Sequence, residues 1–170
     1  LMRLSNVSKR CKLLALGAAA VLSLGLMAGC GSSDQSSSSG SGKTYKIGIV
    51  QLVEHNALDA ANKGFVDGLK ERGFEEGKNI TIDRQNAQAD QSNLQNIAQR
   101  FVSAKMDLIC AIATPAAQTM ANATHDIPIV GTAITDYEGA KLVASNKEPK
   151  GNVTGTSDMN PVKEQIDLLL

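Results

Sequence analysis

The segment QSNLQNIAQRFVSAKMDLICAIATPAAQ, residues 91–118, decides the fold class. Its first part, 91–105, carries apolar residues at the spacing of one helical face: Leu94, Ile97, Ala98, Phe101 and Val102. The run DLICAIA at 107–113 is apolar almost throughout, which is typical of a strand buried on both faces of a parallel sheet. An alanine-rich helix is expected over 114–124. A helix, a buried strand and a second helix in succession indicate an α/β fold.

The flanking sequence continues this alternation. We expect further strands at 45–53, 79–83, 127–134 and 152–157, and further helices at 56–72, 136–143 and 161–170. Gly73 is placed to end the helix before it, as a C-terminal glycine commonly does. Alternating strands and helices joined by right-handed crossovers predict a doubly wound, mostly parallel sheet with helices on both faces.

The first 29 residues have the pattern of a secretory signal. They are basic over 3–12 and then apolar and uncharged over 13–29, LLALGAAAVLSLGLMAG, up to Cys30. LMAGC resembles a bacterial lipobox, which implies that Cys30 is acylated and becomes the new N-terminus. The alternative is a transmembrane anchor, for which an Ala- and Gly-rich run is short against a hydrocarbon core of about 30 Å. We therefore expect a signal peptide over 1–29 and a lipid anchor on the outer side of a bacterial cell membrane.

Composition divides the rest of the chain. Cys30 and the Ser- and Gly-rich stretch after it, 30–43, are expected to form a lipidated, flexible tether. Residues 44–158 are expected to form one α/β lobe. The helix that starts in 159–170 shows an apolar face without a following element, so we expect it to begin a crossover toward a second lobe.

Charge and cysteine spacing exclude several kinds of site. The leader holds four of the 17 basic residues and none of the 17 acidic ones, so the remainder is mildly acidic and lacks the basic face that nucleic acid requires. Cysteines at 11, 30 and 110 match no zinc spacing, and Cys110 is expected to be a buried small hydrophobe. We expect no metal, no cofactor and no nucleic-acid partner.

A candidate ligand site follows from the fold class, because open α/β sheets bind ligands outside the carboxyl ends of their strands. After the third strand, Thr114 is expected to cap a helix with Pro115 at its first position. Position 117 is Ala, so no carboxylate competes for the first-turn N–H groups, and small Ala116 lets an anion approach them. The alternative is that Thr-Pro only starts a helix.

The other strand ends contribute polar residues to the same edge. Asp136 and Asp158 are candidates to pair with an ammonium group, with helix capping or a solvated loop as the alternative for each. A catalytic role for His55 lacks a nucleophile in a suitable sequence context. The remaining polar candidates of these loops are Gln51, Glu54, Thr135 and Ser157.

Four ordered blocks carry a family resemblance: IGIVQLVEHNALDAANKGFVDGLKERGF at 47–74, IDRQNAQADQSNLQNIAQRFVSAKMDLICAIATPAAQ at 82–118, IPIVGTAITDYEGAKLV at 127–143 and NVTGTSDMNPVKEQIDLL at 152–169. Together they resemble the ABC transporter substrate-binding proteins of the tryptophan/tyrosine-binding type. Asn56 and Tyr137 depart from that family's pattern, which frequently has proline at both positions.

The resemblance implies one lobe of a non-enzymatic two-lobe protein that closes over an amino acid, frequently aromatic, and delivers it to an ABC permease and ATPase. It also implies first-lobe ligand contacts at these positions: Gln51, Glu54, His55, Thr114, Pro115, Thr135, Asp136, Ser157 and Asp158. Two alternatives stay open, a lobe that presents its ligand to a membrane receptor and an extracytoplasmic hydrolase on the same fold.

Overall fold

The computed structural model describes residues 42–169, and every structural statement below refers to this part. The leader at 1–29, Cys30 and nearly all of the segment 30–43 lie outside it. The elements, in chain order, are β1 (Tyr45–Gln51), α1 (Asn56–Glu71), β2 (Ile80–Asn86), α2 (Gln91–Ser103), β3 (Leu108–Ile112), α3 (Thr114–Ala123), β4 (Ile129–Ile134), β5 (Val153–Ser157) and α4 (Val162–Asp167).

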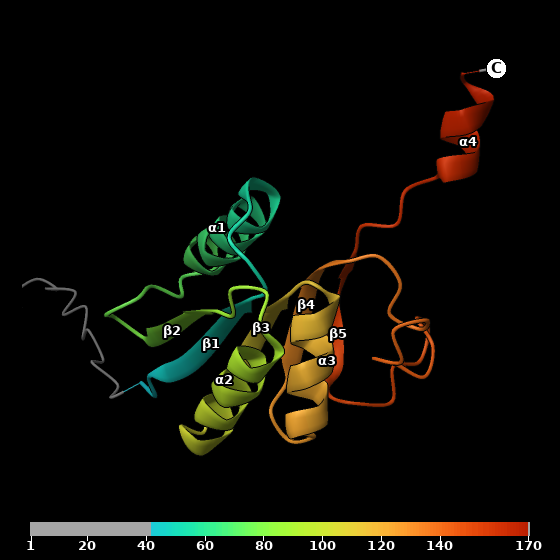
Figure 1. Ribbon diagram of the computed structural model, residues 1–170. Coiled ribbons are helices and arrows are strands. Elements are labelled where there is room, and N and C mark those ends of the chain that lie inside the picture. Colours follow the sequence, from blue (N-terminus) through green and yellow to red (C-terminus); the bar gives the residue numbers. More distant parts are fainter. Residues whose placement is uncertain (1–41, 170) are drawn as a thin grey trace, which may run out of the picture. The chain divides into compact units, whose positions relative to one another are not determined.

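The five strands form one sheet in the order β2-β1-β3-β4-β5, and every neighbouring pair is parallel (Figure 1). The predicted doubly wound fold is therefore confirmed. The chain leaves β1 toward β2 on one side and then returns to place β3 on the other side. The carboxyl ends of β1 and β3 thus flank the point where the strand order reverses, which is where ligands bind in such sheets.

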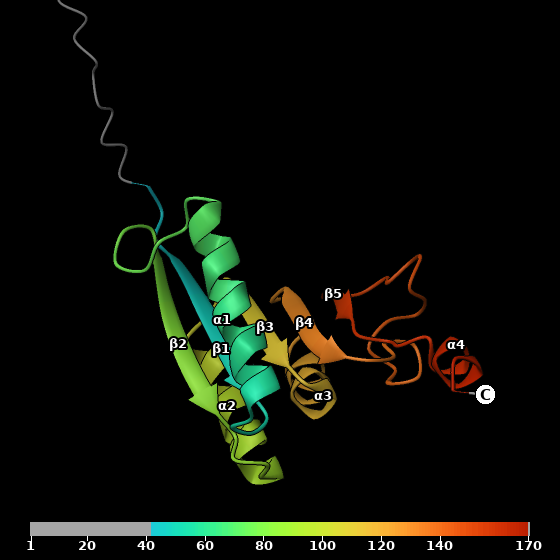
Figure 2. The same cartoon turned by 90° about the horizontal axis from the view of Figure 1, so that it is seen from above.

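Helices cover both faces of the sheet (Figure 2). Side chains alternate along β3, so Ile109 and Ala111 pack in the cluster that contains α2 and α3, whereas Cys110 and Ile112 pack in the cluster beneath α1. Cys110 is fully buried, as predicted, and burial raises the pKa of its thiol to about 12. The DLICAIA run is apolar because both of its faces are covered.

Close packing of α2 on the sheet depends on a glycine. The ring of Phe101 lies against Gly48 of β1, and a Cβ atom at position 48 would stand only 2.7 Å from a ring carbon. Phe101 is fully buried there. The apolar stripe of α2 thus has its partner on a strand more than 40 residues earlier in the chain.

Residues in the left-handed backbone region end two of the helices. The helix expected over 91–105 ends at Ser103, because Lys105 adopts φ +52° and the amides of Lys105 and Met106 return to the carbonyls of Val102 and Phe101. This is the Schellman arrangement, which closes a helix. Gly73 ends α1 in the same way, as predicted, with φ +84°.

The short helix expected over 136–143 is wrong, because this segment forms turns. One helical hydrogen bond forms, from the amide of Ala140 to the carbonyl of Asp136. Lys141 then adopts φ +59°, and the amide of Leu142 returns to the carbonyl of Tyr137. A terminating motif therefore follows the first turn at once, and no helix propagates.

The expected strand over 79–83 is longer, because β2 pairs with β1 in register along seven residues, from Tyr45↔Ile80 to Gln51↔Asn86. The polar sequence of its second half fits an edge strand.

At the other end of the described chain, α4 has no buried residue. No helix between residues 42 and 169 combines the length and apolar character needed to cross a membrane.

Candidate functional site

The candidate site is the carboxyl edge of the sheet. Strands β1, β3, β4 and β5 are parallel neighbours, so their last residues lie side by side at this edge at a spacing of about 4.8 Å per strand. Thr114 follows β3 and Asp136 follows the neighbouring strand β4. The fold therefore brings the predicted loops together along one edge.

Gln51, at the end of β1, turns its side chain inward. It is only 4% exposed, and its amide nitrogen donates to the carbonyl of Val53 at 2.9 Å and to the carboxylate of Asp59 at 2.6 Å. Its amide oxygen accepts from Asn62 at 3.2 Å. These bonds tie the β1 loop to the first turns of α1. Sequence reasoning missed Asp59 and Asn62, whose only signal was two polar residues three positions apart on the sheet-facing side of a helix.

Glu54 and His55 are exposed in the loop after β1. His55 is the N-cap of α1, and its Nδ1 accepts from the amide of Ala57 at 3.2 Å. An accepting Nδ1 assigns the proton to Nε2, so the outer nitrogen remains a donor. The Glu54 carboxylate and the Nε2–H group of His55 are the polar groups that this loop presents to solvent.

The α3 terminus differs from the prediction in its cap. Ala113, not Thr114, is the N-cap; Thr114 is the first helical residue and Pro115 the second. No side chain caps this turn within the described residues, and Ala116 is fully buried. Residues without a hydrogen-bonding side chain at the N-cap leave the first amides of a helix without an internal acceptor, and the helix dipole favours an anion there.

Strained backbone marks the ends of β3 and β4, which the sequence did not reveal. Ala113 adopts φ +84° and ψ 153°, a region that is essentially reserved for glycine, and Ala133 adopts φ +55°. The amide of Ala113 donates to the carbonyl of Thr132 at 3.0 Å, so the two strained strand ends are joined. Strained residues of this kind cluster at ligand sites, where the surrounding structure holds them.

Asp136 is exposed, and its Oδ1 accepts from the amide of Gly139 at 2.9 Å. The carboxylate therefore holds the turn after β4 with one oxygen, which leaves lone pairs on both oxygens for an external donor. The alternative named for this residue was helix capping, and the bond observed is of that kind, but it closes a turn because no helix forms here.

Ser157 and Asp158 follow at the end of β5, where the chain is exposed. The Ser157 hydroxyl donates to the carbonyl of Thr135 at 2.7 Å, and the amide of Asp158 donates to the carbonyl of Ile134 at 3.2 Å. These bonds fasten the end of β5 to the end of β4. Asp136 and Asp158 thus follow neighbouring strands, and together they place two carboxylates at one side of the edge.

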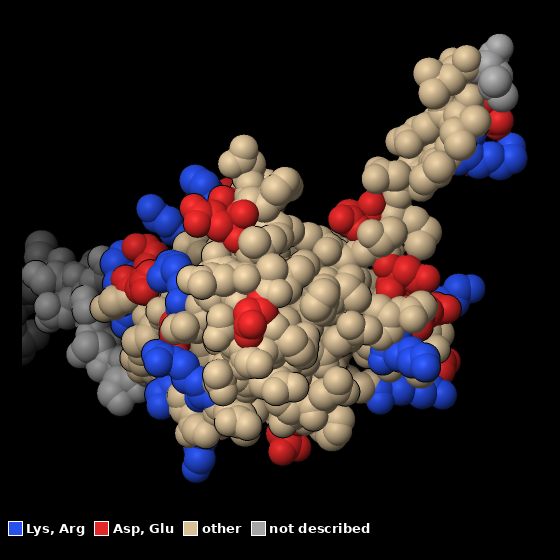
Figure 3. All heavy atoms as spheres, viewed as in Figure 1, with Lys and Arg blue, Asp and Glu red and all other residues tan. Residues whose placement is uncertain are grey.

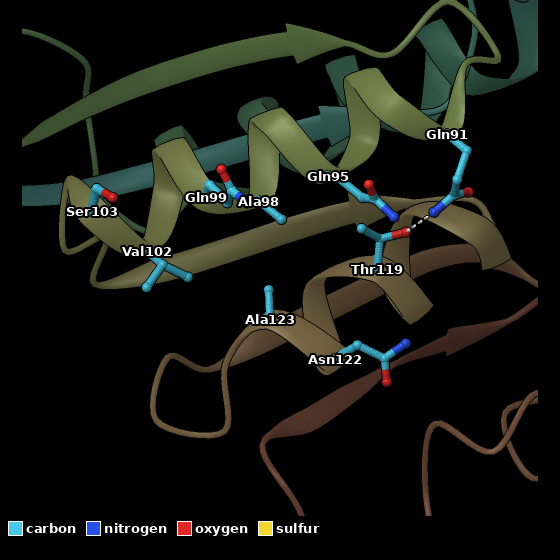
Figure 4. A pocket seen from close by; sticks show the side chains of 9 residues that line it. All are labelled: Gln91, Gln95, Ala98, Gln99, Val102, Ser103, Thr119, Asn122 and Ala123. Atoms are coloured by element: carbon cyan, nitrogen blue, oxygen red, sulfur yellow. Dashed lines mark hydrogen bonds between the residues drawn. The ribbon is translucent and has the colours of Figure 1, made fainter.

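A hollow with a volume of about 540 Å³ lies elsewhere, between the outer surfaces of α2 and α3 (Figure 4). Amide, hydroxyl and small apolar side chains line it, among them Gln91, Gln95, Val102, Thr119 and Asn122. Figure 3 shows few charged side chains over this face. It presents no charge to fix a zwitterion, so we place the candidate site at the strand ends and not in this groove. No group of three or more potential metal ligands occurs within residues 42–169.

Three comparisons relate the chain to known proteins. Residues 46–170 match the family described as ABC transporter substrate binding protein. A tyrosine-binding protein of Clostridioides difficile (strain R20291) is 48% identical over 164 residues, 93% of this chain.

Two solved structures are similar. A ligand-free, open substrate-binding protein with adhesive properties from Clostridium difficile is 53% identical with a TM-score of 0.72 over 74% of this chain. An ABC domain from Streptococcus pneumonia in complex with L-Trp is 45% identical with a TM-score of 0.71 over 75% of this chain. The chain spans about half of these relatives, 48% of the tyrosine-binding protein and 43% of each of the two structures.

Proposed function

Because the chain belongs to the ABC transporter substrate-binding protein family, we propose that it forms the N-terminal lobe of a protein that captures an aromatic amino acid for an ABC importer. One observation supports this proposal above the others. An uncapped helix N-terminus and two carboxylates follow neighbouring strands at the same edge of the sheet. An amino acid carries one anionic and one cationic group, and this edge offers a partner for each.

The amides of the first turn of α3 would receive the ligand carboxylate. Thr114 is half-buried and stands beside them, and its hydroxyl is a further donor. Ala116 adds no bulk, so an anion can approach the backbone. Asp136 and Asp158 would receive the ammonium group, which loses its hydration shell in a closed cleft and therefore needs a charged acceptor.

Glu54 and His55 would extend the site from the loop after β1. The relatives named for tyrosine binding or solved with L-Trp support an aromatic side chain in the ligand. A second lobe would cover the edge and complete the side-chain pocket. In this proposal the protein binds its ligand without converting it chemically, and the permease and ATPase would be its protein partners.

The leader supports an extracytoplasmic location. Residues 1–29 would be removed, Cys30 would be acylated, and 30–43 would tether the lobe of 44–158 to the membrane, with 159–170 leading toward the second lobe. Mass spectrometry of the protein produced in a bacterium tests this. A cleaved chain that begins with lipid-modified Cys30 is expected, and an uncut N-terminus without lipid contradicts it.

Calorimetry of the full-length protein tests the ligand class. L-tyrosine, L-tryptophan and L-phenylalanine are titrated beside tyramine, which lacks the carboxylate, and 3-(4-hydroxyphenyl)propionate, which lacks the ammonium group. At least one amino acid is expected to bind more tightly than both analogues. Equal affinity for L-tyrosine and the two analogues, or no binding by any amino acid, would refute the proposal.

Asp136→Asn and Asp136→Ala separate charge from turn capping. The asparagine oxygen can still accept from the Gly139 amide, so both variants should lose the ammonium contact but only Asp136→Ala should also lose the cap. Loss of one charge-assisted contact weakens binding by about ten- to a hundredfold. Unchanged affinity in Asp136→Asn would remove this residue from the site.

A further inference from the structure

Tyr137 is one of two tyrosines in the chain and is the only aromatic residue in the β4–β5 connection. It follows Asp136 directly, yet its side chain turns away from solvent and is only 5% exposed. Its ring belongs to the core cluster on the α2–α3 side of the sheet. Tyr137 is therefore anchored in the core directly beside Asp136, an exposed candidate ligand contact.

The pairing of β4 with β5 is irregular beside this ring. Gly131 pairs with Gly155, but the next pair is Ile134 with Ser157, so β4 contains one more residue than β5 between these two pairs. This is a β-bulge, which interrupts the ladder of backbone hydrogen bonds. Thr156 of β5 lies between the two pairs and has no paired residue on β4.

The phenol of Tyr137 bonds to this residue of β5. The hydroxyl of Tyr137 donates to the carbonyl of Thr156 at 3.1 Å, while the hydroxyl of Thr156 donates to that of Thr132 at 3.3 Å. The hydroxyl of Tyr137 thus adds a side-chain hydrogen bond to β5 at the bulge.

Two glycines make room for the phenol. A Cβ atom at Gly131 would lie 2.6 Å from the Tyr137 hydroxyl, and one at Gly155 would lie 2.2 Å from it. These glycines are paired with each other across β4 and β5. The fit of one phenol over a glycine pair indicates that the ring occupies a single position.

We propose that Tyr137 is a positioning residue, which fastens the end of β5 to β4 and thereby sets the placement of Asp158 relative to Asp136. The effect on ligand binding rests on the proposed function, whereas the fastening of β5 to β4 does not depend on it. Burial, and then the charge of Asp158, raise the pKa of Tyr137 to about 12, so the hydroxyl keeps its proton and remains a donor.

Amide hydrogen exchange of the unliganded protein tests the fastening. Tyr137→Phe keeps the ring and deletes the bond to Thr156, so the Asp158 amide, which donates to Ile134, should exchange roughly five- to tenfold faster. The amide of Leu52, which donates to Ile112 at the end of β1, serves as the internal reference and should not change. Tyr45→Phe is the matched control, because Tyr45 is exposed at the opposite end of the sheet.

A double-mutant cycle tests the consequence. The measured quantity is the preference for L-tyrosine over 3-(4-hydroxyphenyl)propionate, which reports the ammonium contact. Tyr137→Phe should lower this preference by roughly three- to tenfold in the otherwise unchanged protein and should have no further effect in Asp158→Asn. A residue with only a structural role would lower stability without changing the preference.

Three outcomes overturn the inference: an Asp158 amide that exchanges at the same rate in Tyr137→Phe, a preference that Tyr137→Phe leaves unchanged, or a loss of preference of the same size with and without Asp158→Asn. If the unchanged protein binds no amino acid, the proposed function fails, and the exchange comparison alone still decides whether Tyr137 positions the end of β5.

Discussion

Replacing Ala113 by glycine should stabilise the protein, although alanine-to-glycine changes usually do the opposite. Ala113 is the N-cap of α3 and adopts φ +84° and ψ 153°. A residue with a Cβ atom is strained by about 1–3 kcal/mol in this region, whereas glycine enters it without that strain. Ala113→Gly therefore removes an unfavourable term from the folded state.

Two smaller effects oppose this gain. Glycine has more freedom in the unfolded chain, which costs about 0.4–1 kcal/mol. The methyl group of Ala113 is half-buried, and its loss removes a fraction of the roughly 0.8 kcal/mol that a buried methylene contributes. The expected net result is a rise of about 1 kcal/mol in the free energy of unfolding.

Urea unfolding monitored by circular dichroism measures this change against a control. Ala60 is exposed in the interior of α1, so Ala60→Gly should lower the free energy of unfolding by about 1 kcal/mol. Ala113→Gly should then be the more stable of the two variants by about 2 kcal/mol. If both variants lose the same stability, Ala113 is not strained, and the argument for a held strand end at the site fails.

Three further predictions concern single side chains. His55→Ala should lower the free energy of unfolding by about 1 kcal/mol and His55→Asn should recover most of it, because asparagine also caps helices; equal losses in urea unfolding would contradict the cap. The pKa of Tyr137 is raised to about 12 in the folded protein from 10.0, so between these pH values the phenol ionises in the unfolded chain but not in the folded one. The free energy of unfolding should therefore fall from pH 10 to 12, and Tyr137→Phe should reduce that fall. Parallel profiles of unfolding free energy against pH for the two proteins would be evidence against it. In a chain that starts at residue 42, the thiol of Cys110 should react with Ellman's reagent only after unfolding, because it is buried and its pKa is raised to about 12; rapid reaction of the folded protein would refute its burial.

The fold class could be predicted from local pattern alone. The DLICAIA run, the apolar stripe of α2 and the glycine after α1 each report a property of neighbouring residues, namely their period or their backbone preference. These patterns can be read from the sequence without knowing what each element packs against. They also placed the candidate site at the carboxyl edge, because the position of ligand sites in a doubly wound sheet follows from its topology.

The same local pattern failed where two segments distant in sequence determine the structure. The segment 136–143 has helical spacing, but it ends after one turn and instead inserts Tyr137 beneath the bulge between β4 and β5. Gln51 reads as a polar loop residue, yet its amide is buried against Asp59 and Asn62. Neither role is encoded in the spacing of adjacent residues.

Strand register is the physical reason for this division. The Gly131↔Gly155 pair joins residues 24 positions apart, and it creates the space for a phenol that donates to the carbonyl of Thr156. Ala113 is likewise held at positive φ by a bond from its amide to Thr132 on the next strand. Periodicity in the chain specifies which elements form, whereas the pairing of their ends specifies which polar groups remain available to a ligand.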